Sequence, residues 1–192
     1  MNNIDKVFTV KVIIGIMPNL TQKKADEYFP HLFSAMVEFG INENRLRQAA
    51  FLAQIAHESL ELRFMHEIWG PTKMQKKYEG RDDLGNKHPG DGKRYMGRGP
   101  IQLTGRKNYK QYGESLNLPL EENPELAATP EVAFRVAGKF WQNHKCNELA
   151  DAQKFTEITR LINGGLNGLE VRRRYFTLAK SLLGVIDTGT AL

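Results

Sequence analysis

The chain has 192 residues, of which 41% are hydrophobic and 26% are charged. These fractions are typical of a globular protein and exclude a disordered chain, and the length allows a single domain. The only cysteine, Cys146, excludes a disulfide scaffold and a zinc site made of cysteines. The net charge of +5 favours a polyanionic partner, such as nucleic acid, an anionic cell wall or a membrane surface. No nucleic-acid-binding motif accompanies the charge, so its sign alone does not select the partner.

Two helices are predicted at the start of the chain. Residues 10–17 (VKVIIGIM) are apolar, too short to span a bilayer and not followed by a cleavage site. We therefore expect a first core helix, synthesis in the cytoplasm without a signal peptide, and no stable membrane insertion. Thr21 can cap a second helix, which Pro30 is expected to end or kink and which Gly40 can terminate.

A third helix, which Asn42 can cap, leads into FLAQIAHES at residues 51–59. Glu58 lies at its C-terminal end, where burial and the helix dipole both disfavour a charged carboxylate. A carboxyl group that keeps its proton can serve as a general acid. The alternative is a structural Glu58 that pairs with a buried arginine or caps a neighbouring element.

A second acid, Glu67, follows nine residues later. On a continuous helix it would lie opposite Glu58 and ~13 Å further along the axis. WGP at residues 69–71 is a strong helix stop, so the helix is expected to end before or near Glu67 and the chain to turn back toward the cleft. Inverting glycosidases hold two carboxyl groups about 6.5–9.5 Å apart with a water between them. A helix-end acid that faces a loop acid across a groove would meet this requirement.

Residues 70–105 are rich in Gly, Pro, Asp and Asn, as expected of a long functional loop. Ile101 and Leu103 alternate with Gln102 and Thr104, which predicts a short strand in a small hairpin. His57 has Glu61, not a second histidine, at the zincin spacing, and the acids of this loop lack the EF-hand pattern. We therefore expect no metal site and no cofactor.

The remaining sequence predicts further helices. Asn123 and Thr129 each precede a proline and a glutamate, which predicts a short helix and then a longer one. NGG at residues 163–165 ends a following helix, and Asn167 can cap a last one from Leu169 to about Leu183. No long stretch alternates with period two, so a mostly α fold is expected.

Four motifs in this order resemble glycoside hydrolase family 19: FLAQIAHES, Glu67, YMGRGPIQLTGRKNY, and ITRLINGGLNG followed by VRRRYF. This chitinase family also contains many bacteriophage endolysins, and the resemblance covers about residues 9–183. The chain is similar to the short bacterial and phage members, and IMPNLTQKKADEYFPHLFSAMVEFGI is similar to the phage lysozyme-like branch. The resemblance implies one lysozyme-like helical catalytic domain over residues 1–192. Its cleft-forming loop and short strand would lie at about 68–106, with no separate wall-binding domain.

The resemblance also implies roles for individual residues. Glu58 matches the general acid, Glu67 the general base that activates water, and Thr104 a hydroxyl residue that helps to hold this water. The spacing of the long-loop members would select Glu79 as the base instead. The positions that match substrate-binding or acid-supporting residues are Tyr95, Gln102, Asn108, Asn163 and Arg172.

Two positions depart from the family pattern. Leu60 stands where many members have Gly or Thr, and Asn167 replaces the glutamate of GGLE. Both departures weaken the case for plant-like chitin binding more than the case for hydrolysis.

The function that the resemblance implies is that of an endolysin. It would cleave β-1,4 bonds of peptidoglycan by an inverting mechanism, as a monomer, after holin-dependent release from the cytoplasm, and without nucleic acid as a partner. A chitinase that acts on N-acetylglucosamine polymers with the same residues is one alternative. A basic module that binds cell wall or nucleic acid without catalysis is the other.

Overall fold

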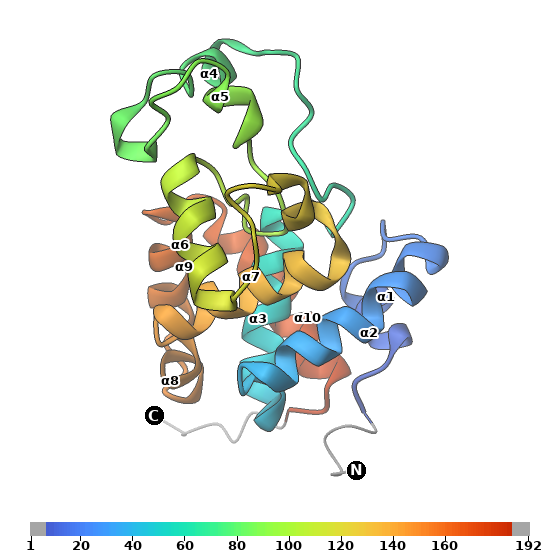
Figure 1. Cartoon of the computed structure of the whole chain (residues 1–192). Coiled ribbons are helices and arrows are strands. Elements are labelled where there is room, and N and C mark those ends of the chain that lie inside the picture. Colours follow the sequence, from blue (N-terminus) through green and yellow to red (C-terminus); the bar gives the residue numbers. More distant parts are fainter. Residues whose placement is uncertain (1–6, 186–192) are drawn as a thin grey trace.

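The helices α3 (Arg45–Glu58) and α10 (Leu169–Leu182) pack against each other at the centre of the structure, a computed structural model that describes residues 7–185 (Figure 1). Every residue from 48 to 56 of α3 is buried, as its apolar sequence predicted. This helix is therefore a rigid support for the residue at its C-terminal end, Glu58.

Helices α1 (Val10–Ile16) and α2 (Gln22–Glu38) flank this central pair, and α2 packs on α7 (Pro130–Asn143). The Thr21 side chain caps α2 by accepting a bond of 3.4 Å from the Lys24 N–H, as predicted. The prediction that α2 could end at Pro30 is wrong, because the helix runs through this residue. Pro30 is exposed, so water can solvate the carbonyl group that loses its partner.

The predicted cap of α3 is also wrong. Gly40, at a φ of 66°, ends the α2 region and leads into the 3-10 helix η1 (Ile41–Glu43). Asn42 lies in that short helix and accepts a bond of 2.6 Å from the Gln48 Nε2. Asn44 caps α3 instead, by accepting a bond of 2.7 Å from the Leu46 N–H.

The C-terminal half follows the predicted order of helices. After α6 (Arg106–Leu116) come η3 (Pro124–Ala128) and α7, each with a proline in its first turn, then α8 (Cys146–Asp151) and α9 (Phe155–Asn163). Gly164 ends α9 at a φ of 70°, as NGG predicted. The residue before α10 is Gly168 rather than an Asn167 cap.

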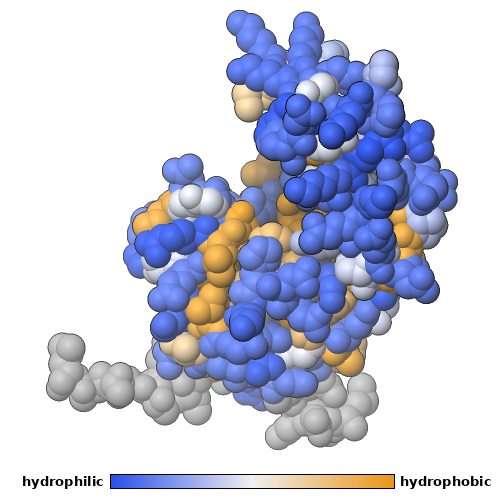
Figure 2. Space-filling model, turned by 60° about the vertical axis from the view of Figure 1, so that its left-hand side comes forward, coloured by the Kyte–Doolittle hydropathy of each residue, from blue (hydrophilic) through white to orange (hydrophobic). Residues whose placement is uncertain are grey.

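Residues 70–95 form an irregular lobe that stands above the helical body (Figure 1). It contains α4 (Lys73–Lys76), η2 (Asp82–Leu84) and α5 (Asp91–Arg94). Of the expected hairpin, residues 7–185 contain only the isolated bridges His66–Arg98 and Arg98–Leu103. The surface of the lobe is mostly hydrophilic (Figure 2, top). No helix in the described part of the chain is long and apolar enough to cross a membrane.

Candidate active site

Glu58 ends α3, and its side chain is 25% exposed. One of its oxygens, Oε1, forms an ion pair with Nη2 of Arg172 from α10, whose side chain is only 1% exposed. The pair with a buried arginine is the one that the structural alternative predicted.

A buried network fixes Arg172 in turn. Its Nη1 donates to Gln54 Oε1 at 2.6 Å, and Gln54 Nε2 donates to the Thr159 hydroxyl at 2.8 Å. All three side chains are buried. Helices α3, α9 and α10 together hold the arginine, so the orientation of Glu58 depends on the central packing of the protein.

His57, next to Glu58, packs closely on Gly168. A Cβ atom at position 168 would lie 2.4 Å from Cε1 of the imidazole ring, and Gly168 has a φ of 72°. Burial, and then the charge of Arg172, lower the pKa of His57 below its ordinary value of 6.5. His57 is therefore a packed, neutral residue, and we assign it no role in proton transfer.

The chain leaves α3 immediately after Glu58, so the helix ends before Glu67, as the sequence predicted. Leu60, Glu61 and Leu62 form a left-handed turn, with φ angles of 51°, 63° and 58°. This turn ends the helix, so Glu67 is not carried away from Glu58 along a continuous helix axis.

Glu67 lies in an extended segment that pairs with residue 97. The Glu67 N–H donates to the Gly97 carbonyl at 2.8 Å, and the Gly97 N–H donates to Glu67 Oε2 at 3.2 Å. The Tyr78 hydroxyl donates to Glu67 Oε1 at 3.4 Å. Burial, and then the charge of Glu67, raise the pKa of Tyr78. The irregular lobe thus holds Glu67 through Tyr78.

Gly97 allows the close approach of two functional side chains. A Cβ atom there would lie 2.5 Å from Gln102 Oε1 and 3.3 Å from Glu67 Oε2. A larger residue at position 97 would push the Gln102 side chain away from its present position, so Gly97 leaves room for Gln102 beside Glu67.

Both acids line one cavity of about 350 Å³ between α3 and the segment that carries Glu67. The other lining residues are Ser59, Leu60, Phe64, His66, Ile68 and Gln102. A second cavity, of about 780 Å³, adjoins it at Gln102 and is lined by Thr104, Asn108 and other uncharged residues. We refer to these two cavities, which share Gln102, as the cleft, and Glu58 and Glu67 supply its carboxylates.

Gln102 and its neighbours lie in this cleft, as expected. Gln102 has a φ of 55°, so the expected strand alternation is replaced by a turn. The Thr104 hydroxyl donates to the Gln102 carbonyl at 2.8 Å, and Asn108 Nδ2 donates to the Thr104 carbonyl at 2.7 Å. Thr104 borders the second cavity rather than the one that holds the acids.

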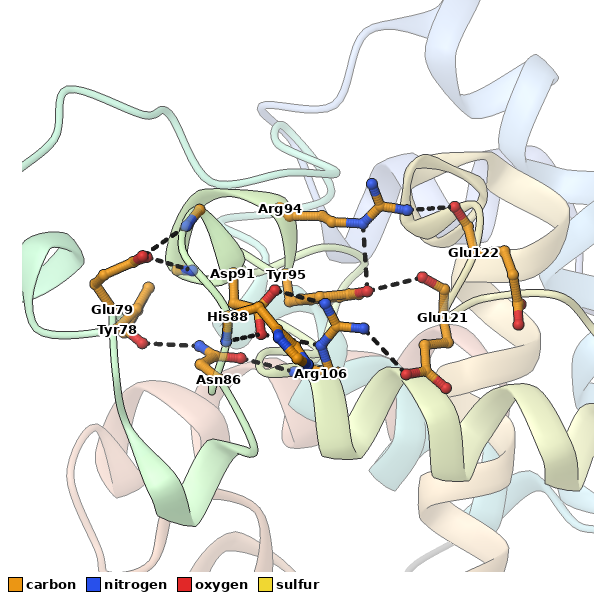
Figure 3. Close-up of polar contacts among 12 residues, drawn as sticks. Tyr78, Glu79, Asn86, His88, Asp91, Arg94, Tyr95, Arg106, Glu121 and Glu122 are labelled. Carbon is orange, nitrogen blue, oxygen red and sulfur yellow. Dashed lines mark hydrogen bonds and ion pairs between the residues drawn. The ribbon is translucent and has the colours of Figure 1, made fainter.

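Two of the expected substrate-binding residues are buried at 1% exposure. The Tyr95 hydroxyl donates to the Glu121 carbonyl at 2.9 Å, and the Arg106 guanidinium lies 4.7 Å from the centre of its ring (Figure 3). The prediction that Tyr95 binds sugar is therefore wrong, because its ring holds the lobe instead. Arg172 supports the acid and does not line the cleft. Asn163, at the end of α9, has a buried Nδ2 without a hydrogen-bond partner among the described residues.

Glu79, the other candidate base, organises the irregular lobe. Its oxygens accept bonds of 2.6 and 2.8 Å from the N–H groups of Gly90 and Gly92 (Figure 3). It lines neither of the two cavities. This placement favours Glu67 over Glu79 as the base.

Sequence reasoning missed Gln54 and Tyr78, which hold Arg172 and Glu67. The only signal for Gln54 was a polar residue one helical turn before Glu58 on a buried helix. Tyr78 carried no local signal. Within residues 7–185, no group of three or more His, Cys, Asp or Glu side chains could hold a metal ion.

A helical body with two glutamates in one cleft has the features of a glycosidase that uses a carboxylate pair. The family model described as chitinase class I matches residues 25–154. The chain therefore belongs to glycoside hydrolase family 19 and is a chitinase-like glycosidase.

Curated relatives show the same family. A glycosyl hydrolase family 19 domain-containing protein of Haemophilus influenzae is 31% identical over 185 residues, which cover 79% of this chain and 90% of that protein. An endochitinase of Arabidopsis thaliana is 42% identical over 118 residues, or 61% of this chain and 38% of its own length. The chain thus spans less than half of this plant relative.

Solved structures show the same fold. Chitinase C from Streptomyces griseus HUT6037 has a TM-score of 0.75 and 25% identity, with 93% of both chains covered. A bacterial family 19 chitinase has a TM-score of 0.76 and 23% identity, with 95% of this chain and 98% of that chain covered. These similarities confirm the lysozyme-like helical fold that the sequence motifs implied.

Proposed function

We propose that this protein is an endolysin that hydrolyses the β-1,4 bonds of peptidoglycan glycan strands. The observation that carries the proposal is that Glu58 and Glu67 line one cavity and are held by separate parts of the chain. Arg172 of the helical core holds the Glu58 side chain, whereas the backbone of Gly97 holds the Glu67 side chain. A glycan strand in the cleft would therefore pass between two independently fixed carboxyl groups.

In the proposed mechanism Glu58 is the general acid. Arg172 binds Oε1, which leaves Oε2 to carry the proton and deliver it to the leaving glycosidic oxygen. Glu67 takes a proton from a water on the opposite face of the sugar, and the resulting hydroxyl group bonds to the anomeric carbon. The configuration at that carbon is inverted. The proton lost by Glu58 and the proton gained by Glu67 balance over one turnover, after which solvent restores both groups.

The binding roles are assigned by position in the cleft. Gln102 borders both cavities, and Asn108 lies in the second, so their amide groups suit the acetamido and hydroxyl groups of an N-acetylated glycan. The roles of Thr104 in holding water and of Asn163 in holding substrate rest on the family resemblance and not on their positions in the two cavities. The protein would act as a monomer on the wall after holin-dependent release from the cytoplasm.

The preference for peptidoglycan rests on the net charge of +5, which suits an anionic wall, and on the similarity of the opening sequence to phage members of the family. A chitinase is the second candidate, because the Arabidopsis and Streptomyces relatives carry that name. Purified peptidoglycan and N-acetylglucosamine oligomers, each incubated with the protein, would separate the two. Mass spectrometry of the released fragments identifies the bond, and NMR of the fresh product identifies its anomeric configuration.

Glu58→Gln tests whether the protein is a catalyst at all. Glutamine keeps the size of the side chain but has no proton to deliver, so turnover should fall by at least about a hundredfold. Circular dichroism should show an unchanged fold. A folded variant with near-normal turnover would contradict the assignment of Glu58 as the general acid, whereas a wild-type protein that binds wall material without releasing fragments would favour a non-catalytic wall-binding module.

A further inference from the structure

The left-handed turn at residues 60–62 is made of three consecutive non-glycine residues, Leu60, Glu61 and Leu62. This conformation is unfavourable for an L-residue because its Cβ lies too close to the following carbonyl oxygen. Such strain persists only where the surroundings enforce it, and it concentrates at functional sites. Here the strained turn directly follows Glu58.

Glu61 anchors this turn from the side away from the cleft. Its carboxylate is 7% exposed and accepts three bonds: 2.6 Å from the Asn19 N–H, 3.1 Å from Asn19 Nδ2 and 2.7 Å from the Tyr175 hydroxyl. Burial and the bond to Glu61 raise the pKa of Tyr175 to about 12, so this hydroxyl remains a donor. The proposed hydrolysis makes no use of Glu61.

Two further bonds fix the backbone of the turn. The Glu61 N–H donates to the Ala56 carbonyl at 2.7 Å, and the Leu62 N–H donates to the Ser59 hydroxyl at 2.7 Å. The anchoring groups come from α3, α10 and the loop before α2. Because three elements converge on it, the turn has one defined geometry.

The turn presents Leu60 to the cleft. This side chain is 61% exposed and lines the same cavity as Glu58 and Glu67, together with Phe64 and Ile68. An exposed leucine needs no explanation by itself. A leucine that a strained and anchored backbone holds beside a catalytic acid does need one.

We propose that Leu60 is a substrate-contacting residue and that Glu61 is the positioning residue that places it. Leu60 would pack on the methyl-bearing face of an N-acetylated sugar next to the bond that is cleaved. The inference rests on the proposed function in one respect, namely that the cleft binds N-acetylated glycans. It names the residue that supplies apolar contact to a site whose other proposed binding groups are amides and hydroxyls.

The direct test is Leu60→Gly. Glycine adopts a positive φ freely, so the variant should unfold at the same temperature as the wild type or higher. Its KM for N-acetylglucosamine oligomers and for peptidoglycan should rise about five- to tenfold through the lost apolar contact, with kcat within about twofold. Val37→Ala, which trims another exposed apolar residue, on α2 and outside the cavity, should leave KM unchanged. An unchanged KM in Leu60→Gly would overturn the proposal.

Combining a Glu61 variant with Leu60→Gly tests whether Glu61 acts through Leu60. In Glu61→Gln an amide N–H₂ replaces one acceptor oxygen, so at least one of the three donors loses its partner. KM should rise as in Leu60→Gly, whereas in the Leu60→Gly background the same change should leave KM unaltered, because no side chain remains to be placed. Additive effects on KM would show that Glu61 does not act through Leu60.

These outcomes are separable from the proposed function. If the wild-type protein cleaves N-acetylglucosamine oligomers but not peptidoglycan, the endolysin proposal fails and the KM comparison on oligomers still tests Leu60. If it cleaves neither, calorimetric titration of the oligomer into wild type and Leu60→Gly decides, with equal affinities overturning the contact.

Discussion

Glu58 shows how one residue can satisfy two opposed interpretations. Its pairing with a buried arginine suits a structural residue, yet its carboxyl group lines the cleft that also holds Glu67. The two interpretations are compatible because an acid must be oriented before it can deliver a proton with the right geometry. Arg172 supplies that orientation.

At the residue scale, the structure distinguishes the two candidate bases. Glu67→Gln should abolish most hydrolysis because the amide cannot accept the proton of the attacking water. Glu79→Gln should lower activity less, through loss of its bonds to the lobe backbone. Rates of peptidoglycan lysis by the two variants, each checked for folding, make the comparison. A reversed order of the two losses would assign the base to Glu79.

A second residue-scale prediction concerns His57. The pKa of His57 is lower in the folded protein than in the unfolded chain, so the unfolded chain binds the proton more readily. His57 therefore stabilises the fold at pH values above its ordinary pKa of 6.5, and this contribution is lost as the pH falls. His57→Gln should remove that part of the pH dependence. Urea unfolding of both proteins at about pH 7.5 and about pH 5 is the measurement. If the wild type and His57→Gln lose the same stability between these two pH values, the pKa of His57 is not lowered in the folded protein.

At the scale of elements, local signals predicted most helices and failed at some of their ends. The Thr21 side chain can cap a helix, and the prolines at 124 and 130 fix their own φ at a helical value. The starts of these helices were therefore predictable from the local sequence. Asn42 and Asn44 are equally good caps by composition. The choice between them depends on the long side chain of Gln48, which binds Asn42 and leaves Asn44 to cap.

The irregular lobe was predictable as a loop but not as an ordered body. Arg106 of α6 holds it with bonds of 2.9 and 2.7 Å to both oxygens of Asp91, which is 2% exposed, and with a bond of 3.1 Å to Glu121 (Figure 3). The bond to Arg106 is the largest cause that lowers the pKa of Asp91. Composition cannot reveal such a contact, because its partners lie in different elements.

Arg106→Gln should therefore loosen the lobe. It leaves a buried carboxylate without its cation, a loss of about 3 kcal/mol, at the low end for a broken buried pair. Hydrogen exchange should accelerate at residues 72–95 while α3 and α10 stay protected. Arg81→Gln is the matched control, since its exposed pair with Asp83 lies in the same lobe. Uniformly faster exchange across the chain would contradict a local role.

At the scale of the whole molecule, the motifs predicted the family and the two acids, because each motif carries chemistry in a short stretch. They did not predict the neighbours of these acids. Gln54 and Thr159 are 105 residues apart, and Glu58 and Arg172 are 114 apart. Only the packing of α3 with α9 and α10 brings them together.

The net charge of +5 leads to a prediction about the whole surface. Lys73, Lys76 and Lys77 are exposed on the lobe and can attract an anionic wall. Attraction between exposed charges is screened beyond about 8 Å at physiological ionic strength, so lysis of wall material should fall steeply with added salt. Hydrolysis of a short neutral oligosaccharide should change little.

Charge reversal makes this prediction specific. Changing the three lysines to Glu lowers the net charge by six, from +5 to −1, and should slow wall lysis and weaken its salt dependence. Changing Lys11, Lys23 and Lys145 to Glu lowers the charge equally at exposed sites outside the lobe. Equal effects of the two triple variants would show that net charge alone matters. Equal salt sensitivity on both substrates would remove the targeting role.

The ion pair between α3 and α10 also has a consequence for synthesis. The ribosome makes the helix that carries Glu58 more than a hundred residues before the helix that carries Arg172, since the two residues are 114 apart. Until α10 emerges and docks, Gln54 and Glu58 lack the cation that orients them. A nascent chain would therefore acquire its oriented acid only after the other parts of the cleft have been made.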